Sequence, residues 1–406
     1  MSNNSITYLF PFRRVKFTDF GQIKNFKGKT ALIAETEPDL RFNPICHECG
    51  SEADGIHSWH RRPLYDLPIG SNPVKILYNY RKIECDTCDK IKVEDLNVTD
   101  AGGPKITNRM AQYIYDLCDK MTVDKVAEHL GLDPKTVKNV EKQFLKEEYG
   151  ETDFSHSGYL AVDEISVGKY HEYMTVVLDF STGRVIWVGN DRKFETLNKF
   201  FKKMPSDKIK QIEAVAMDMW NPYIKAVKSW CPQASIVFDK YHIISDFNDV
   251  IDQVRRNEQN KESLSKQQKD VIKGNRWLLL KNKENLKKDQ KPELDELLRL
   301  NKNLFKVYIL KEELKYIWKQ NSEKEMKNAI KDWCLKALRT NLKPVIKFVK
   351  KIQDHLDGVL EYVNHQIHTS KLEGVNNKIK EIKRSAYGFH DDNYFKLKIK
   401  KAFPGN

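Results

Sequence analysis

Long apolar runs are missing from this 406-residue sequence. No stretch approaches the roughly 18 apolar residues that span a bilayer, and the N-terminus has no basic-then-apolar export signal. We therefore expect a cytoplasmic protein that does not associate with membranes. Disorder throughout the chain is excluded as well, because 40% of the residues are hydrophobic. A chain of this length is expected to form two or three domains.

Acidic residues are outnumbered in the chain. Asp and Glu total 57 against 70 Lys and Arg, which gives a formal net charge of +13. A strongly basic protein is expected to bind a polyanion, so nucleic acid is the first partner to consider. Ribosomal and membrane-surface proteins share this balance, so the charge limits the class of partner without identifying it.

Cysteines are too few for a disulfide framework: there are seven, and four of them form two C-x-x-C pairs. Cys46 and Cys49 form the first C-x-x-C motif, and Cys85 and Cys88 form the second. This spacing is typical of a zinc site in a reducing compartment. Four thiolates fill the tetrahedral shell of zinc and leave no position for a substrate, so we expect one structural zinc. The alternative is four free thiols in two unrelated turns.

The residues around these pairs are interpreted as a zinc ribbon that spans 41–100. Between the pairs, residues 73–81 alternate between apolar and polar, as a strand does. His57 and His60 lie in the same interval and are alternative ligands, but we expect them at the surface or facing DNA. Residues 1–40 carry little pattern, and we treat them as an N-terminal segment without an assigned role.

A helix-turn-helix domain is predicted for residues 101–150. Three short stretches have apolar residues at helical spacing, and an Asp-Pro pair supplies the N-cap and first residue of the third helix. The exposed face of that helix is expected to reach base edges and phosphates. The residues on this face are Lys135, Thr136, Lys138 and Asn139. The alternative is a helical spacer whose basic face is only solvated.

Residues 155–254 are predicted to form a mixed sheet in the order β-β-β-α-β-α-β-α. The first strand, 159–163, and the fourth, 214–218, both end in an aspartate. We expect these strand ends to lie side by side, so that Asp163 and Asp218 face one pocket. Paired carboxylates suit magnesium, and two such ions stabilise both oxygens of a phosphoryl displacement. RNase H-like nucleases and recombinases have this arrangement.

Residues 255–360 are rich in lysine and carry apolar stripes at helical spacing. Within them, Pro344 is expected to open one long helix that continues to Val363. The charged faces of this region have two interpretations: they keep the helices soluble, or they follow the phosphates of DNA.

Residues 361–406 contain a further helix, on which one face carries an acid, an amide and two cations. These residues are Glu373, Asn376 or Asn377, Lys380 and Arg384. If this segment stood alone, an ordinary amphipathic helix with an ion-paired face would explain it.

Three motifs then follow one another in a specific order along the chain. They are residues 160–164 (LAVDE), residues 216–220 (AMDMW) with 238–242 (FDKYH) after them, and residues 372–380 (LEGVNNKIK). Together with the zinc ribbon and helix-turn-helix ahead of them, they resemble a DDE transposase of a bacterial insertion sequence, of the ISL-three group. The resemblance implies a multidomain α/β protein. Its parts are an N-terminal zinc ribbon, a trihelical helix-turn-helix domain and an RNase H-like mixed β-sheet catalytic domain interrupted by an all-α insertion.

The resemblance also implies roles for individual residues. Asp163, Asp218 and Glu373 are the expected catalytic acids, and they would hold two magnesium or manganese ions. Lys380 matches a basic residue seven positions after the acid, where a phosphate contact is expected. On the same helix face, Asn376 and Arg384 are expected DNA contacts. Asp239 and His242 are expected either to support the metal ligands or to contact DNA.

The implied function is DNA transposition: binding to the terminal inverted repeats of an insertion sequence, then metal-dependent strand cleavage and strand transfer. The expected partners are the double-stranded DNA of the element's ends and of the target. A homodimer is expected in the DNA complex, because two ends must be brought together, and the site of action is the nucleoid of a bacterial cytoplasm. Two alternatives remain open: an RNase H-like nuclease, or a zinc-dependent DNA-binding regulator without catalysis.

Overall fold

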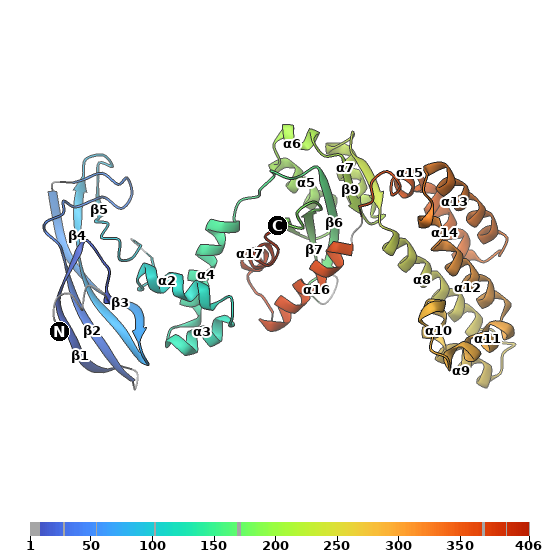
Figure 1. Cartoon of the computed structure of the whole chain (residues 1–406), viewed down its shortest axis with the longest axis horizontal. Coiled ribbons are helices and arrows are strands. Elements are labelled where there is room, and N and C mark those ends of the chain that lie inside the picture. The colour runs from blue at the N-terminus through green and yellow to red at the C-terminus, as the bar shows by residue number, and fades with distance from the viewer. Residues whose placement is uncertain are drawn as a thin grey trace. The chain divides into compact units, whose positions relative to one another are not determined.

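The computed structural model of the protein consists of two compact units, Met1–Glu151 and Thr152–Asn406 (Figure 1). It describes residues 9–26, 29–53, 55–100, 103–168, 172–367, 370–386 and 388–405. Each unit is described by itself below.

A mixed β-sheet forms the first part of the N-terminal unit. Its strands lie in the order β1-β2-β4-β3, and β5 also pairs with β4. The pairing of β2 with β4 is parallel, and the other pairs are antiparallel. The strands are β1 (Val15–Phe26), β2 (Lys29–Pro38), β3 (Gly55–Ile69), β4 (Asn72–Cys85) and β5 (Lys90–Val93).

Two of these strands, β1 and β2, come from the segment to which the sequence analysis assigned no role. They pair with each other, and β2 then pairs with β4 of the ribbon. Register shifts interrupt β1 between Phe17 and Asp19 and again between Phe20 and Gln22. Each shift breaks the period-two alternation by which a strand is recognised in a sequence. The predicted strand at residues 73–81 lies within β4.

The helix-turn-helix prediction is confirmed. Its helices are α2 (Asn108–Leu117), α3 (Val123–Leu130) and α4 (Pro134–Tyr149). Gly131 ends α3 at φ +66°, a left-handed conformation that glycine adopts without steric cost. The carboxylate of Asp133 accepts a hydrogen bond from the backbone N–H of Lys135 at 2.8 Å and so caps α4.

A buried carboxylate joins the sheet to the helices within this unit. Asp66 of β3 is 2% exposed. It accepts hydrogen bonds from Thr107 Oγ1 at 2.6 Å and from Arg109 Nε at 2.8 Å, and it forms an ion pair with the Arg109 guanidinium. The ribbon and α2, the first helix of the helix-turn-helix domain, are therefore held together by a paired buried charge as well as by apolar packing.

The C-terminal unit is built on a second mixed sheet, in the order β10-β9-β6-β7-β8. The strands β6, β7 and β8 form an antiparallel meander, and β6, β9 and β10 are parallel. This topology confirms the predicted mixed sheet. The strands are β6 (Tyr159–Ser166), β7 (Tyr173–Asp179), β8 (Val185–Asn190), β9 (Ala214–Met217) and β10 (Ser235–Phe238).

Helices cover both faces of this sheet. Leu160, Val162 and Val215 pack on the side of α5 (Phe194–Lys203) and α7 (Asn221–Trp230), which α6 (Ser206–Lys210) accompanies. Ala161 and Ala216 instead pack on the side of α16 (Ser370–Ser385) and α17 (Asp392–Ala402), which Figure 1 shows beside β6 and β7. The alternation of side chains along each strand therefore decides which helix layer a residue meets.

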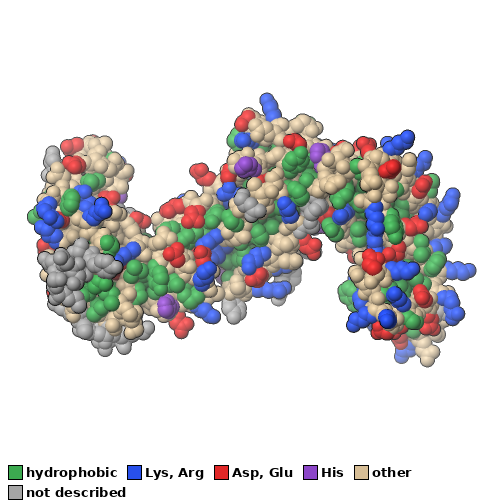
Figure 2. Space-filling model, in the orientation of Figure 1, with side chains coloured by type: hydrophobic (Ala, Val, Ile, Leu, Met, Phe, Trp, Pro, Cys, Tyr) green, Lys and Arg blue, Asp and Glu red, His purple; other side chains and the backbone are tan. Residues whose placement is uncertain are grey.

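An all-α block follows β10. Its elements are α8 (Lys240–Gln259), α9 (Lys266–Gly274), α10 (Arg276–Leu280), η1 (Lys283–Asn285), α11 (Gln290–Leu300), α12 (Lys302–Leu314), η2 (Ile317–Lys319), α13 (Glu323–Leu338), α14 (Lys343–Asp354) and α15 (Leu356–Leu360). Figure 2 shows Lys and Arg side chains over this block interspersed with Asp and Glu. The mixed charges suit a solvated surface, and the interpretation that this block follows DNA phosphates stays a prediction.

The single long helix predicted to run from Pro344 to Val363 is wrong. The structure has two helices there, α14 and α15, divided at His355. Gly358 of α15 lies so close to β10 that a Cβ would be 2.5 Å from Phe238 Cε2 and 2.9 Å from the carbonyl oxygen of Ile236. This close approach of α15 to the sheet explains why the chain changes direction after α14.

The buried ion pair in the N-terminal unit can be tested by removing one partner. We expect Asp66→Ala to lower the free energy of unfolding of this unit by about 3–5 kcal/mol, because the Arg109 guanidinium loses its partner. Denaturant unfolding of the full chain, followed at a probe in the N-terminal unit, measures the change. Asp124→Ala, an exposed residue of α3, is the control and should cost less than about 1 kcal/mol. Equal effects of the two substitutions would contradict a stabilising joint at Asp66.

Candidate functional site

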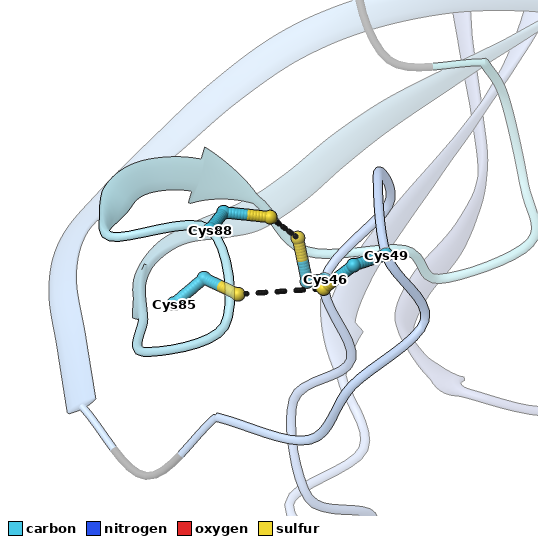
Figure 3. Close-up of side chains that lie close together, drawn as sticks. All are labelled: Cys46, Cys49, Cys85 and Cys88. Carbon is cyan, nitrogen blue, oxygen red and sulfur yellow. Dashed lines mark hydrogen bonds between the residues drawn. The ribbon is translucent and has the colours of Figure 1, made fainter.

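Four cysteine thiols converge in the N-terminal unit (Figure 3). The Sγ atoms of Cys46, Cys49, Cys85 and Cys88 all lie within 4.8 Å of one another. Cys46 Sγ is 3.9 Å from Cys88 Sγ, and Cys49 Sγ is 3.5 Å from Cys85 Sγ. Tetrahedral zinc with Zn–S bonds near 2.3 Å would place its thiolates ~3.8 Å apart. The spacing is too long for a disulfide and matches a zinc site.

Short turns bring these cysteines together. Gly50, at φ +73°, donates its backbone N–H to the carbonyl of Cys46 at 2.9 Å and closes the first turn. Cys85 ends β4, and Cys88 lies in the turn between β4 and β5. His57 and His60 belong to β3 and do not contribute to the ligand cluster found among the described residues. The cysteines alone therefore form the candidate zinc centre.

Asp163 lies on β6, and Asp218 directly follows β9, the neighbouring parallel strand of the second sheet. The last pair in the β6–β9 register is Ala161 with Ala216, and each aspartate lies two residues beyond its alanine. Because side chains alternate along a strand, both carboxylates start from the same face as these alanines. The predicted strand end at Asp163 is wrong, since β6 continues to Ser166. It is β9 that stops, at Met217, which leaves this edge of β6 unpaired beside Asp163.

His242 of α8 lies beside Asp218 and is close enough to Asp163 to feel its charge. Its Nδ1 lies 3.6 Å from Asp218 Oδ2. This contact raises the pKa of His242 to about 9, against the effect of burial, and the charge of Asp163 acts in the same direction. Burial opposes ionisation of Asp218, but the contact and charge of His242 outweigh it and lower the pKa of that carboxyl. His242 is therefore a cation at neutral pH that supports the charge of Asp218.

Asp163 is more deeply buried than Asp218. It is 6% exposed, and burial raises its pKa to about 6 in spite of the nearby His242 charge. Asp163 Oδ1 accepts a hydrogen bond from the backbone N–H of Glu164 at 2.8 Å, and Oδ2 accepts one from Asn376 Nδ2 at 2.8 Å. The local protein groups therefore only partly stabilise the charge of this carboxylate.

The helix α16 carries the remaining candidate residues of this site. Asn376 reaches Asp163, whereas Glu373, one turn earlier, is exposed, as are Lys380 and Arg384 further along. Among the described residues, the cysteines are the one group of three or more metal-type side chains that converges. The structure thus brings Asp163, Asp218, His242 and Asn376 together and leaves the Glu373 carboxylate at the surface of the same helix.

The other predicted site residues have local roles or exposed positions. Asp239 is 1% exposed and caps α8 by accepting a hydrogen bond from the backbone N–H of Tyr241 at 2.9 Å. In the first turns of α4, Lys135 and Asn139 are exposed, and Thr136 and Lys138 are half-buried. An exposed start of the recognition helix is what contact with bases and phosphates requires.

An arginine that the sequence analysis did not single out links the two segments that carry the aspartates. Arg192, in the loop after β8, donates from Nη1 to Glu164 Oε1 at 3.1 Å. Its guanidinium lies over the rings of Tyr173 at 4.1 Å and Trp220 at 4.6 Å, and its carbonyl accepts a hydrogen bond from Trp220 Nε1 at 2.9 Å. Glu164 follows Asp163, and Trp220 lies two residues after Asp218. No periodicity or motif marks Arg192, because its partners meet only in the folded sheet.

Family models match most of the chain. A DDE-class transposase model of family ISL3 matches residues 160–399, and a model for the helix-turn-helix domain of the same family matches residues 105–145. A zinc-finger model for the transposases IS204, IS1001, IS1096 and IS1165 matches residues 43–88. The chain belongs to the ISL3 family of transposases. It is an insertion-sequence transposase with a zinc ribbon, a helix-turn-helix and a DDE catalytic domain.

Similar proteins agree with membership of the ISL3 family. The transposase for insertion sequence element IS1001 of Bordetella parapertussis is 36% identical over 363 residues, which cover 89% of each chain. The transposase for IS1557 of Mycobacterium tuberculosis is 26% identical over 257 residues, or 58% of each chain. In the part of the chain that the structure describes, no helix has both the length and the apolar character needed to cross a bilayer.

The zinc centre of this ISL3 transposase can be tested by counting bound metal. We expect purified protein to carry about one zinc per chain, and Cys88→Ser to lose most of it, because one of four ligands is removed. Mass spectrometry of bound metal measures the ratio. Cys334→Ala, a buried thiol of α13 outside the cluster, is the control and should retain zinc. Full zinc content in Cys88→Ser would contradict the four-cysteine site.

Proposed function

We propose that this transposase binds the terminal inverted repeats of its insertion sequence and cleaves and joins DNA with Asp163, Asp218 and Glu373. The observation that carries the proposal is the register of β6 and β9, which gives the two aspartates equivalent positions on one face of the sheet. The hydrogen bond from Asn376 to Asp163 supports a place for α16, and with it Glu373, at the same site.

A divalent cation fits these residues. Carboxylates are hard oxygen ligands of the kind that magnesium and manganese bind. Burial raises the pKa of Asp163 to about 6, so a nearby cation would stabilise the ionised form of this carboxyl group. Asn376 Oδ1 is a buried oxygen without a hydrogen-bond partner. We infer that Asp163, Asp218 and Glu373 hold two such ions, which when bound supply activation of water and stabilisation of phosphoryl oxygens.

The reaction proposed is a hydrolysis followed by a transesterification. In the first step, a water oxygen bonds to phosphorus, the bond from phosphorus to the 3′ oxygen breaks, and that oxygen takes up a proton to leave a 3′-hydroxyl. In the second, this hydroxyl loses its proton, bonds to a target phosphorus and displaces another 3′ oxygen. Each step exchanges one P–O bond for another, so no oxidant or nucleotide is consumed.

The chain's own residues have distinct parts in this scheme. His242 keeps Asp218 ionised, as its contact with that carboxylate implies. Lys380 and Arg384, exposed on α16 beyond Glu373, are placed to bind the phosphates of the strand being cut. Lys135, Thr136, Lys138 and Asn139 at the start of α4 read the terminal repeat.

The proposal extends to the assembly. A productive reaction joins two ends of one element, so we infer that at least two copies of the chain act together on DNA in the nucleoid. The target DNA is a further double-stranded partner of the same complex.

Substitution of an acid tests catalysis separately from binding. We expect Asp218→Asn to lower magnesium- or manganese-dependent cleavage of DNA that carries the element's ends by at least ~100-fold, because a charged metal ligand is lost. Gel analysis of strand products and a binding assay without divalent metal measure the two properties. Asp249→Asn, the same change at an exposed position of α8, should leave both unchanged. Binding by the unmodified protein without any cleavage would contradict the catalytic proposal and favour an inactive, DNA-binding copy.

The recognition helix predicts two different binding defects. Lys135→Ala should weaken binding to all DNA sequences and reduce the salt dependence of log Kd by about 1, since one phosphate contact is lost. Asn139→Ala should lower the preference for the terminal repeat over scrambled DNA by about 1–3 kcal/mol, since a base contact is lost. Fluorescence anisotropy at several salt concentrations measures both. Lys146→Ala, exposed near the other end of α4, is the control. A similar defect in Lys146→Ala would show that α4 does not bind DNA through its first turns.

A further inference from the structure

The amide of Asn376 occupies an unusual position on α16. Leu372, Val375 and Ile379 pack that helix against the sheet, and Asn376 lies at the border between this buried face and the exposed one. Its side chain turns to the sheet, where Nδ2 donates to Asp163 Oδ2 at 2.8 Å. The next residue, Asn377, has the same side chain but is exposed. Two adjacent asparagines of one helix are therefore in different environments.

The hydrogen bond from Asn376 leaves Asp163 able to bind a cation. Asp163 Oδ1 accepts one hydrogen bond, from Glu164, and Oδ2 accepts one, from Asn376. An ionised carboxylate oxygen can accept two interactions, so each oxygen keeps a lone pair. Asn376 thus fixes the orientation of the carboxylate without using up its capacity as a ligand.

The other polar atom of this amide, Asn376 Oδ1, has no hydrogen-bond partner although it is buried. A buried acceptor without a partner costs free energy, and native structures rarely retain one without a use. Reversing the amide would not help, because Oδ1 would then face a carboxylate oxygen and two acceptors would meet. The hydrogen bond from Nδ2 to Asp163 therefore fixes the orientation of the amide and leaves Oδ1 without a partner next to a carboxylate.

We propose that Asn376 is a metal-site residue: its Nδ2 orients Asp163, and its Oδ1 is a further oxygen ligand for the cation that Asp163 holds. Amide oxygens are ordinary ligands of hard cations, alongside carboxylates. The inference rests on the proposed metal-dependent function and deepens it. It gives Asn376 a different role from the DNA contact expected from its position on the helix face.

This assignment makes α16 a helix with two metal-site positions one turn apart, Glu373 and Asn376. The bond between Asn376 and Asp163 joins the helix to β6, so docking of α16 and assembly of the metal site become one event. Cation binding then favours the docked helix, and the docked helix favours cation binding.

Direct measurement of metal binding tests the assignment without any reaction. Manganese binding to the full chain, without DNA, is measured by electron paramagnetic resonance of free Mn²⁺. We expect Asn376→Ala to weaken Mn²⁺ binding by about 10- to 100-fold. Asn377→Ala, the exposed neighbour, is the matched control and should bind Mn²⁺ as the unmodified protein does. Affinity for the element's ends, measured without added Mn²⁺ or Mg²⁺, should stay within about twofold in both variants.

A second substitution separates the oxygen from the donor. Asn376→Asp keeps an oxygen at this position and loses the Nδ2 donor. If Oδ1 is a ligand, this variant should bind Mn²⁺ at least tenfold more tightly than Asn376→Ala. Equal weakness of the Asp and Ala variants would overturn the ligand role. Thermal unfolding without added Mn²⁺ controls for folding, and Mn²⁺ affinities are compared only at temperatures where each variant is folded.

Two outcomes distinguish the inference from the function on which it rests. If Asn376→Ala binds Mn²⁺ normally but loses affinity for the ends, the residue is a DNA contact and the inference fails. If the unmodified protein binds Mn²⁺, loses it in Asp218→Asn and in Asn376→Ala, yet cuts no DNA, the metal site stands and the proposed catalytic function fails.

Discussion

The parallel pairing of β6 with β9 is the constraint on which the catalytic unit depends. Its register places Asp163 and Asp218 at matching positions, and a shift by one residue in either strand would turn one carboxylate to the opposite helix layer. The apolar residues of both strands prevent such a shift, because Leu160 and Val215 belong to one core and Ala161 and Ala216 to the other. The packing of the sheet and the pairing of the acids are thus decided by the same alternation.

Elements far apart in the sequence support this pair from several sides. His242, in the first turn of the helix after β10, lies beside Asp218. Asn376, which follows the all-α block in the sequence, reaches Asp163. Arg192 packs between two aromatic rings and binds Glu164. Charged and polar groups with different partners therefore stabilise the chain around Asp163 and Asp218.

Much of this arrangement could be predicted from the sequence, and the exceptions have physical causes. The cysteine pairs, the capped helix α4 and the strand order all have local signals: ligand spacing, Asp-Pro at a helix start, and period-two apolar runs. The hairpin of β1 and β2 was missed because its register shifts disturb that period. The break at His355 was missed because the packing of Gly358 on β10 is a tertiary contact. Arg192 and the partner of Asn376 were missed for the same reason, since neither contact leaves a trace in sequence spacing.

The contact of Gly358 with β10 also bears on how such a chain can diversify. The all-α block leaves the sheet through α8, directly after β10, and its last helix, α15, returns to that same strand. The first and last helices of the block, α8 and α15, thus both adjoin β10 at one edge of the sheet. Helices added or removed between α8 and α15 need not change the order or register of the sheet strands next to the aspartates. Gly358 thus marks the point at which the block returns to the sheet, and the helices between the first turn of α8, which carries His242, and α15 can change without altering the site beside them.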